Sequence, residues 1–180
     1  MGETHILSRT QIGLYGLPAV AISVLTLPFF IFIPTFYTET LGLHLAAVGL
    51  VLSAIRLFDA VNDPLIGFWS DRLRPAYGRR RSWFLAGIPL TILGVWMVFV
   101  PGETSSLGYM AVWGLILSIG WSVVQLPYAA WGAELSSDYR TRSRLSAVRE
   151  GLVVLGTLIA ITLPIMASGA ETVTTPGLMM

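Results

Sequence analysis

The stretch from Ile12 to Tyr37 reads IGLYGLPAVAISVLTLPFFIFIPTFY and carries no charged side chain. A helix needs roughly 20 mainly apolar residues to cross a bilayer, whereas the apolar part of a signal peptide has about 7–15. This stretch is too long for a signal peptide, and no pair of small residues marks a cleavage site at its end. It therefore predicts an uncleaved membrane span.

The composition of the whole chain points the same way. Of its 180 residues, 54% are hydrophobic and 12% are charged, whereas about 25% of the residues of a soluble domain are charged. This composition argues against a soluble globule, a disordered chain and a nucleic-acid-binding protein. Cysteine is absent, which excludes disulfides, thiol nucleophiles and thiolate metal sites.

Four further stretches are long and apolar enough to cross a membrane, and the connectors between them are short. We expect a single all-α membrane domain over residues 1–180, because no linker is long enough to separate two domains. Its predicted spans are about 12–37, 45–70, 83–100, 107–133 and 145–167.

The arginines predict how these spans are oriented. All eleven basic residues are arginine, and nine of them lie before the first span or in the connectors that follow the second and the fourth. The other connectors and the tail carry none. Because positive charge accumulates on the cytoplasmic side, we expect a cytoplasmic N-terminus and a tail that lies outside.

The second span contains a cluster of ionisable residues between Arg56 and Pro64, RLFDAVNDP. Arg56, Asp59, Asn62 and Asp63 lie within about 120° of one helix face. Each charge near the bilayer centre costs roughly 2.5–3.5 kcal/mol on the insertion scale, so this face must be turned toward protein or water.

Two carboxylates and one guanidinium on this face leave one negative charge unmatched. A proton, a bound monovalent cation or an arginine from another helix would neutralise it. A cation such as Na⁺ prefers oxygen ligands, which Asp59, Asp63 and the Asn62 amide supply. A second interpretation is an Arg56–Asp pair that only fixes helix packing.

Two further sets of polar residues lie in the last two spans. Ser122, Gln125 and Tyr128 are spaced by three on the fourth span, where a hydroxyl, an amide and an aromatic ring suit a sugar-like ligand. Aromatic packing is the alternative. Arg149 of the fifth span is the other candidate, unless its side chain only reaches the membrane interface.

At these residues the chain resembles a known family. Gly67–Arg72, GFWSDR, and Tyr77–Arg81, YGRRR, resemble the loop motif between helices two and three of the major facilitator superfamily. The run Arg56–Pro64 is similar to the glycoside–pentoside–hexuronide:cation symporters, typified by the bacterial melibiose carrier, and Glu134–Asp138, ELSSD, also matches.

The resemblance implies roles for individual residues. Asp59, Asn62, Asp63 and Ser122 would bind the cation, and Arg149 would contact the substrate. From the residues themselves, Arg56 is the expected charge partner, and Gln125 and Tyr128 are the other expected substrate contacts. The sugar-binding acids of the melibiose carrier have no acidic counterpart here, since Gly16–Pro18 stands in the region of one and Gln125 in place of the other. A cytoplasmic gate would comprise Gly67, Asp71, Arg72, Gly78, Arg79 and Arg80.

From these residues we expect a secondary active transporter of the inner membrane that moves a sugar or glycoside together with Na⁺ or H⁺. It would be no enzyme and would hold no cofactor besides the coupling ion. The five spans would belong to an N-terminal helix bundle of an expected twelve helices, with membrane lipid, a small polar solute and the missing C-terminal half as partners. The alternatives are a carrier for a non-sugar or lipid-like solute and a truncated remnant that does not transport.

Overall fold

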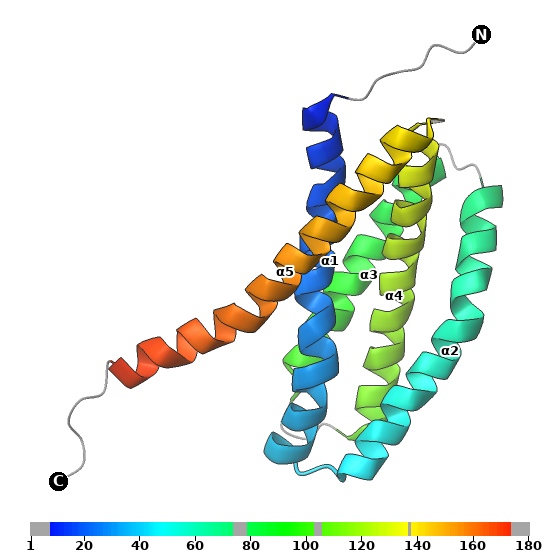
Figure 1. Ribbon diagram of the computed structural model, residues 1–180. Coiled ribbons are helices and arrows are strands. Elements are labelled where there is room, and N and C mark those ends of the chain that lie inside the picture. The colour runs from blue at the N-terminus through cyan, green and yellow to red at the C-terminus, as the bar shows by residue number, and fades with distance from the viewer. Residues whose placement is uncertain (1–7, 74–78, 103–105, 137, 174–180) are drawn as a thin grey trace. The chain divides into compact units, whose positions relative to one another are not determined.

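The computed structural model describes residues 8–73, 79–102, 106–136 and 138–173, and every regular element in these residues is a helix (Figure 1). Five stretches are long and apolar enough to cross a membrane. The prediction of an all-α membrane protein with five spans is thereby confirmed. In chain order the elements are α1 (Arg9–Thr35), the short π-helical segment η1 (Phe36–Thr40), α2 (Leu45–Arg72), α3 (Arg79–Phe99), α4 (Leu107–Glu134) and α5 (Tyr139–Val173).

Three helices begin before the apolar stretches that predicted them. α1 begins at Arg9 rather than at 12, α3 begins at Arg79 rather than at 83, and α5 begins at Tyr139 rather than at 145. Arginine is a good helix former, so α3 and α5 extend into the arginine-rich connectors that a search for apolar residues leaves out.

Asp138 caps the early start of α5. Its carboxylate oxygen Oδ2 accepts a hydrogen bond of 2.9 Å from the backbone N–H of Thr141 and another from the Thr141 hydroxyl. These bonds favour the charged form and lower the pKa of Asp138 below its ordinary value.

The chain divides into two compact units, one of residues 32–135 and one that joins the residues up to Ile31 to those from Ser136 onward. In the first unit, α3 packs along α4 through glycines (Figure 1). A Cβ atom on Gly94 would lie 2.7 Å from the Cα of Leu117, and one on Gly120 would lie 2.8 Å from the backbone nitrogen of Thr91. The two backbones therefore approach too closely for any side chain at these positions.

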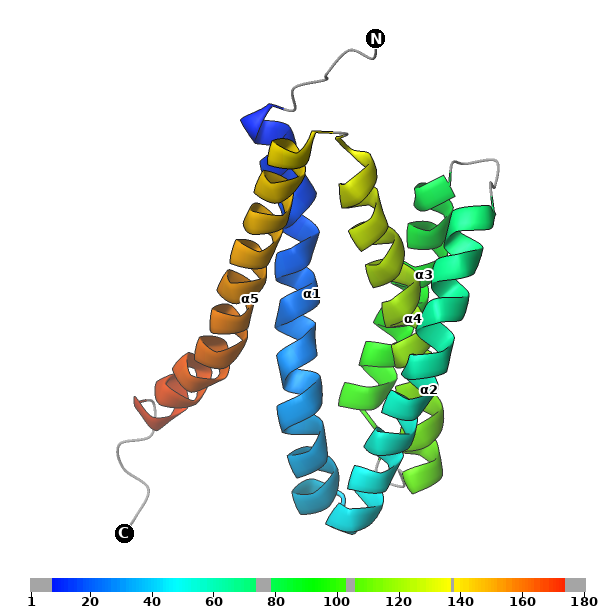
Figure 2. The same cartoon turned by 45° about the vertical axis from the view of Figure 1, so that its right-hand side comes forward.

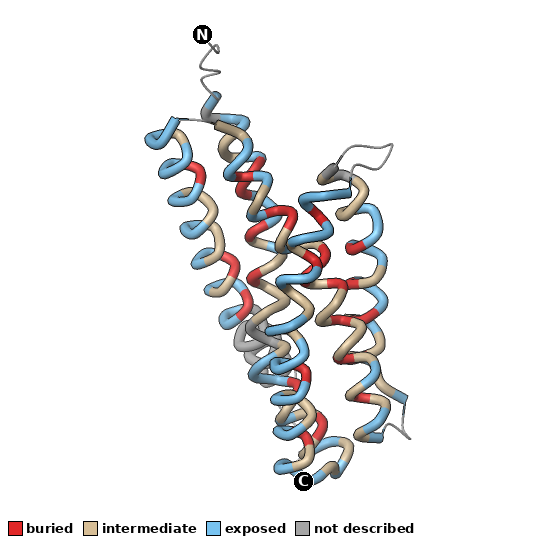
Figure 3. The backbone as a smooth tube through the Cα atoms, turned by 90° about the vertical axis from the view of Figure 1, so that its right-hand side faces the viewer, coloured by how far each residue is buried: buried red, intermediate tan, exposed pale blue. Residues whose placement is uncertain are grey.

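α2 packs against α4 as well, and the side chain of its Ile55 fills the space over Gly114 of α4. Much of its remaining surface carries large apolar side chains that are exposed in the structure. Pale blue marks exposed residues of every kind in Figure 3. The exposed apolar surface of α2 requires an apolar environment, as a membrane-spanning helix has. Its exposed apolar residues include Leu50, Leu57, Val61, Leu65, Phe68 and Trp69.

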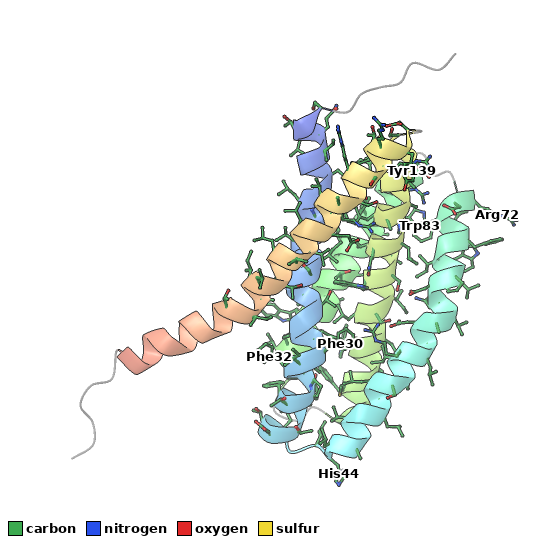
Figure 4. All side chains as sticks on the ribbon, in the orientation of Figure 1. Phe30, Phe32, His44, Arg72, Trp83 and Tyr139 are labelled. Atoms are coloured by element: carbon green, nitrogen blue, oxygen red, sulfur yellow. The ribbon has the colours of Figure 1, made fainter. Side chains whose placement is uncertain are left out.

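The segment η1, which precedes the turn into α2, is hydrogen-bonded to the end of α3. Tyr37 is fully buried, and its hydroxyl donates a hydrogen bond of 3.1 Å to the backbone carbonyl of Val98. Gly42 has a φ of +68°, a left-handed conformation that glycine adopts without strain. Figure 4 shows His44 at this end of α2 and Arg72 at the opposite end.

In the other unit, α5 lies alongside the first part of α1 (Figure 2). Glycines again mark the contact. A Cβ atom on Gly16 would lie 3.1 Å from the side chain of Val148, and one on Gly156 would lie 3.1 Å from the Cα of Val20. Small residues at such contacts are typical of helices that associate in membranes.

We expect the variants Gly94→Ala and Gly120→Ala to destabilise the packing of α3 on α4 by about 1–3 kcal/mol each, because the added methyl group meets backbone atoms that cannot move aside. Gly49→Ala on α2 is the matched control, because its Cβ would meet nothing within 4 Å. Unfolding by denaturing detergent in mixed micelles measures the difference. Equal stability of all three variants would contradict the close contact.

Candidate functional site

The ionisable face of α2 lies against two serines of α4. The Ser118 hydroxyl donates a hydrogen bond to Oδ1 of Asp59, and the Ser122 hydroxyl donates one of 2.5 Å to Oδ1 of Asp63. Both pairs are part-buried. The structure therefore brings Asp63 and Ser122 together as predicted, and it adds Ser118, which sequence reasoning missed.

Arg56 forms an ion pair with Asp59 of the same helix. Its Nη1 lies 3.7 Å from Oδ2 of Asp59, and the exposed fractions of the two side chains are 59% and 18%. Among the residues that the structure describes, Asp63 forms no ion pair, and its hydrogen-bond partner is the Ser122 hydroxyl. The negative charge that the sequence leaves unmatched is thus that of Asp63.

Asn62 is adjacent in sequence to this unmatched carboxylate. Its amide nitrogen Nδ2 is buried and finds no hydrogen-bond partner among the described residues, which costs about 1–3 kcal/mol for a polar group removed from water. Rotation of the amide by 180° places the carbonyl oxygen at the same position. An oxygen there suits a cation, so the residues present fit the ligand set that the resemblance implies.

The predicted substrate residues of α4 differ in accessibility. Gln125 is exposed, whereas Tyr128 has an exposed fraction of 3%. Gln125 thus lies on the surface of the described helices, and Tyr128 is packed among them.

Arg149 belongs to the unit formed by α1 and α5. Its Nη2 lies 2.7 Å from Oε1 of Glu150, and it also interacts with the hydroxyl of Tyr15 on α1. Since 28% of the Arg149 side chain is exposed and a partner lies on another helix, it faces protein rather than only the membrane interface. Tyr15 had not been identified from the sequence, because nothing in its local spacing marks it.

Arg80 joins three helices at the end of α2 that carries Arg72. Its Nη2 contacts Oδ1 of Asp71 at 3.0 Å and Oε1 of Glu134 at 2.5 Å, and its Nη1 donates to the Ser70 hydroxyl at 3.3 Å. Burial by itself lowers the pKa of the Arg80 guanidinium, but the hydrogen bonds to Glu134 and Asp71 outweigh it and raise the pKa above its ordinary value. The charge is therefore permanent.

The other predicted gate residues are placed differently. The guanidinium of Arg72 stacks over the ring of Phe68, 4.0 Å from its centroid. Gly67 has open space where a side chain would be. Gly78 and the side chain of Arg79 lie outside the described residues. Asp71 and Arg80 are thus the two gate candidates that the structure brings into contact.

Five apolar helices whose spans hold paired polar residues are typical of multi-span membrane proteins. The family described as MFS/sugar transport protein matches residues 14–180, so the chain belongs to that family. The resemblance to the cation symporters is thereby confirmed. The family comprises carriers rather than enzymes, and the chain is a multi-pass membrane protein.

Three similar proteins illustrate the match. A symporter of Synechocystis is 31% identical over 83% of this chain and 28% of its own length. A putative glycoside/cation symporter of Escherichia coli, YagG, is 31% identical over 91% of this chain and 36% of its own length. A sodium-dependent lysophosphatidylcholine symporter of zebrafish is 30% identical over 62% of this chain and 22% of its own length. The chain therefore spans about a third of the length of the first two relatives.

We expect Arg80→Gln to weaken the association of α2 and α4 at this end, because the two carboxylates that Arg80 bridges, Asp71 and Glu134, then repel each other without a cation between them. Since both carboxylates are partly exposed, the effect is about 1 kcal/mol, or about fivefold in the rate of local opening. The chain has no cysteine, so maleimide labelling of Ser70→Cys, which replaces a buried side chain, measures that rate.

Arg72→Gln is the matched control, because it removes a positive charge that stacks on Phe68 instead of joining the helices. Equal labelling rates with both glutamine variants would mean that the ion pairs of Arg80 do not stabilise the contact of α2, α3 and α4 near Ser70.

Proposed function

We propose that the chain forms part of a symporter in which Na⁺ or H⁺ binds at Asp59, Asn62, Asp63 and Ser122 and drives the transport of a glycoside. The observation that carries the proposal is the unmatched negative charge of Asp63, which accepts a hydrogen bond from Ser122, together with the buried amide of Asn62, whose nitrogen has no partner among the described residues. A monovalent cation would cancel that charge, with the Asp63 carboxylate, the Ser122 hydroxyl and a rotated Asn62 amide as oxygen ligands.

The bound cation supplies the coupling. Without it, closing the protein around Asp63 buries an unpaired carboxylate, which is costly in a low-dielectric interior. With it, the closed states become accessible and the loaded protein alternates between its inward-facing and outward-facing forms. Solute and cation therefore strengthen each other's binding by the same factor.

The solute site needs more helices than these five. In the unit of residues 32–135, Gln125 and Tyr128 would offer an amide and an aromatic ring to a sugar, and in the other unit Arg149 would offer a guanidinium. Since the chain spans about a third of the length of the relatives it matches, further helices of the whole carrier would supply the opposite wall.

The charge pattern supports an orientation in the inner membrane. Nine arginines lie on one side of the predicted spans, which favours a cytoplasmic N-terminus and places the Arg80 contacts on the cytoplasmic side. There the ion pair of Arg80 with Asp71 and Glu134 would act as a gate.

A second candidate function is the transport of a lipid-like amphiphile. Two observations favour it: the positions of the sugar-binding acids are occupied by Gly16–Pro18 and Gln125, and one relative is a lysophosphatidylcholine symporter. The same cation site would serve either solute.

We expect Asp63→Asn and Asp59→Asn to abolish cation-dependent uptake by the complete carrier, because each removes a charged cation ligand. Uptake of labelled solute into vesicles with imposed Na⁺ or pH gradients measures this. Asp138→Asn is the control, since it changes an exposed carboxylate at the start of α5 and retains a residue that caps helices well. Concentrative uptake that both site variants leave unchanged would refute the proposed site.

The choice of solute has its own test. We expect Na⁺ or an acidic pH to increase the binding of a glycoside to the carrier and, by reciprocity, the glycoside to increase cation binding by the same factor. Titration calorimetry with a panel of glycosides and with lysophosphatidylcholine checks this. Coupling with the lysophospholipid alone would favour the second candidate function.

A further inference from the structure

We infer that Ser118 is a positioning residue of the proposed cation site: its hydroxyl holds the Asp59 carboxylate toward α4, against the attraction of Arg56. This inference rests on the proposed function. It concerns a residue outside the cation-binding set that the resemblance implies.

The two oxygens of Asp59 have partners on different helices. Oδ1 accepts the hydrogen bond from Ser118 on α4, whereas Oδ2 lies 3.7 Å from Arg56 of its own helix. The Asp59 side chain is 18% exposed and that of Arg56 is 59% exposed. Ser118 thus draws the carboxylate toward the helix interface, and Arg56 draws it toward the exposed side.

The register of α2 and α4 explains why the serine is so placed. Three contacts follow one another at four-residue steps on both helices: Ile55 with Gly114, Asp59 with Ser118, and Asp63 with Ser122. Residues four apart lie on the same face of a helix. The absence of a side chain at Gly114 lets Ile55 approach the α4 backbone, and the two hydroxyls then face the two carboxylates one turn apart.

Loss of the Ser118 hydroxyl leaves Arg56 as the described partner of Asp59. Attraction between opposite charges in a low-dielectric region then favours a carboxylate turned toward Arg56 and away from Asp63. The cation would have to compete with the guanidinium for Asp59. Ser118 therefore keeps two carboxylates available to one ion.

The test measures the Na⁺ concentration at constant pH, and the pH without Na⁺, that give half-maximal solute uptake by the complete carrier. We expect Ser118→Ala to raise the required concentration of the driving ion about tenfold or more, as for a lost hydrogen bond to a charged group. Ser118→Thr, which keeps the hydroxyl, should stay within about threefold of the original protein. Ser53→Ala, at an exposed serine of α2, is the control.

A second variant, in which Arg56 is replaced, distinguishes a positioning role of Ser118 from a role in helix packing alone. In the Ser118→Ala background, Arg56→Gln should recover most of the lost affinity, because nothing then turns Asp59 away. An unchanged ion requirement in Ser118→Ala, or a loss that neither threonine nor Arg56→Gln restores, would overturn the inference. If Asp63→Asn still abolishes coupling in that case, the proposed function stands, and if Asp63→Asn has no effect, the proposed function fails as well.

Discussion

The contact between the charged face of α2 and the hydroxyl face of α4 is the constraint on which the rest of the unit depends. Three ionisable groups in one membrane span are costly unless protein or water surrounds them, and Ser118 and Ser122 supply part of that surrounding. The apolar side chains of α2 can then occupy the remaining surface. The position and rotation of α2 therefore depend on its polar residues as well as on the apolar contact of Ile55 with Gly114.

Close approach of the helices makes these short polar contacts possible. A serine side chain is short, so its hydroxyl reaches a carboxylate on another helix only where the backbones come near each other. Gly114 allows this between α2 and α4, and Gly94 and Gly120 allow α3 to approach the other side of α4. Near the start of α2, the hydrogen bond from the Tyr37 hydroxyl to the carbonyl of Val98 connects η1 to the end of α3.

Much of this architecture is predictable from the sequence, because membrane spans depend on local hydropathy. The pairing of Asp63 with Ser122 was also implied by the family resemblance. Ser118, Glu134 and Tyr15 were not assigned a role, since each acquires its partner through the rotation of one helix against another. A serine among apolar residues has the same local pattern whether it faces a carboxylate or its own backbone. The arginine-rich starts of α3 and α5 were missed because hydropathy, which located the spans, excludes arginine.

The two polar clusters of this unit have the same charge but different surroundings. Arg80 faces two carboxylates, Asp71 and Glu134, just as Arg56 shares its helix face with Asp59 and Asp63. At the helix end, the Asp71 and Glu134 side chains are 64% and 38% exposed, so solvent and counterions screen the excess negative charge, and the cluster needs no bound ion. Within the span, Asp63 is only partly exposed, and the side-chain amide nitrogen of the preceding residue in the chain, Asn62, is buried without a partner among the described residues. The same excess charge is more expensive within the span, and this difference in surroundings, more than the identity of the residues, is the reason that the proposed cation site lies at Asp63 and not at Arg80.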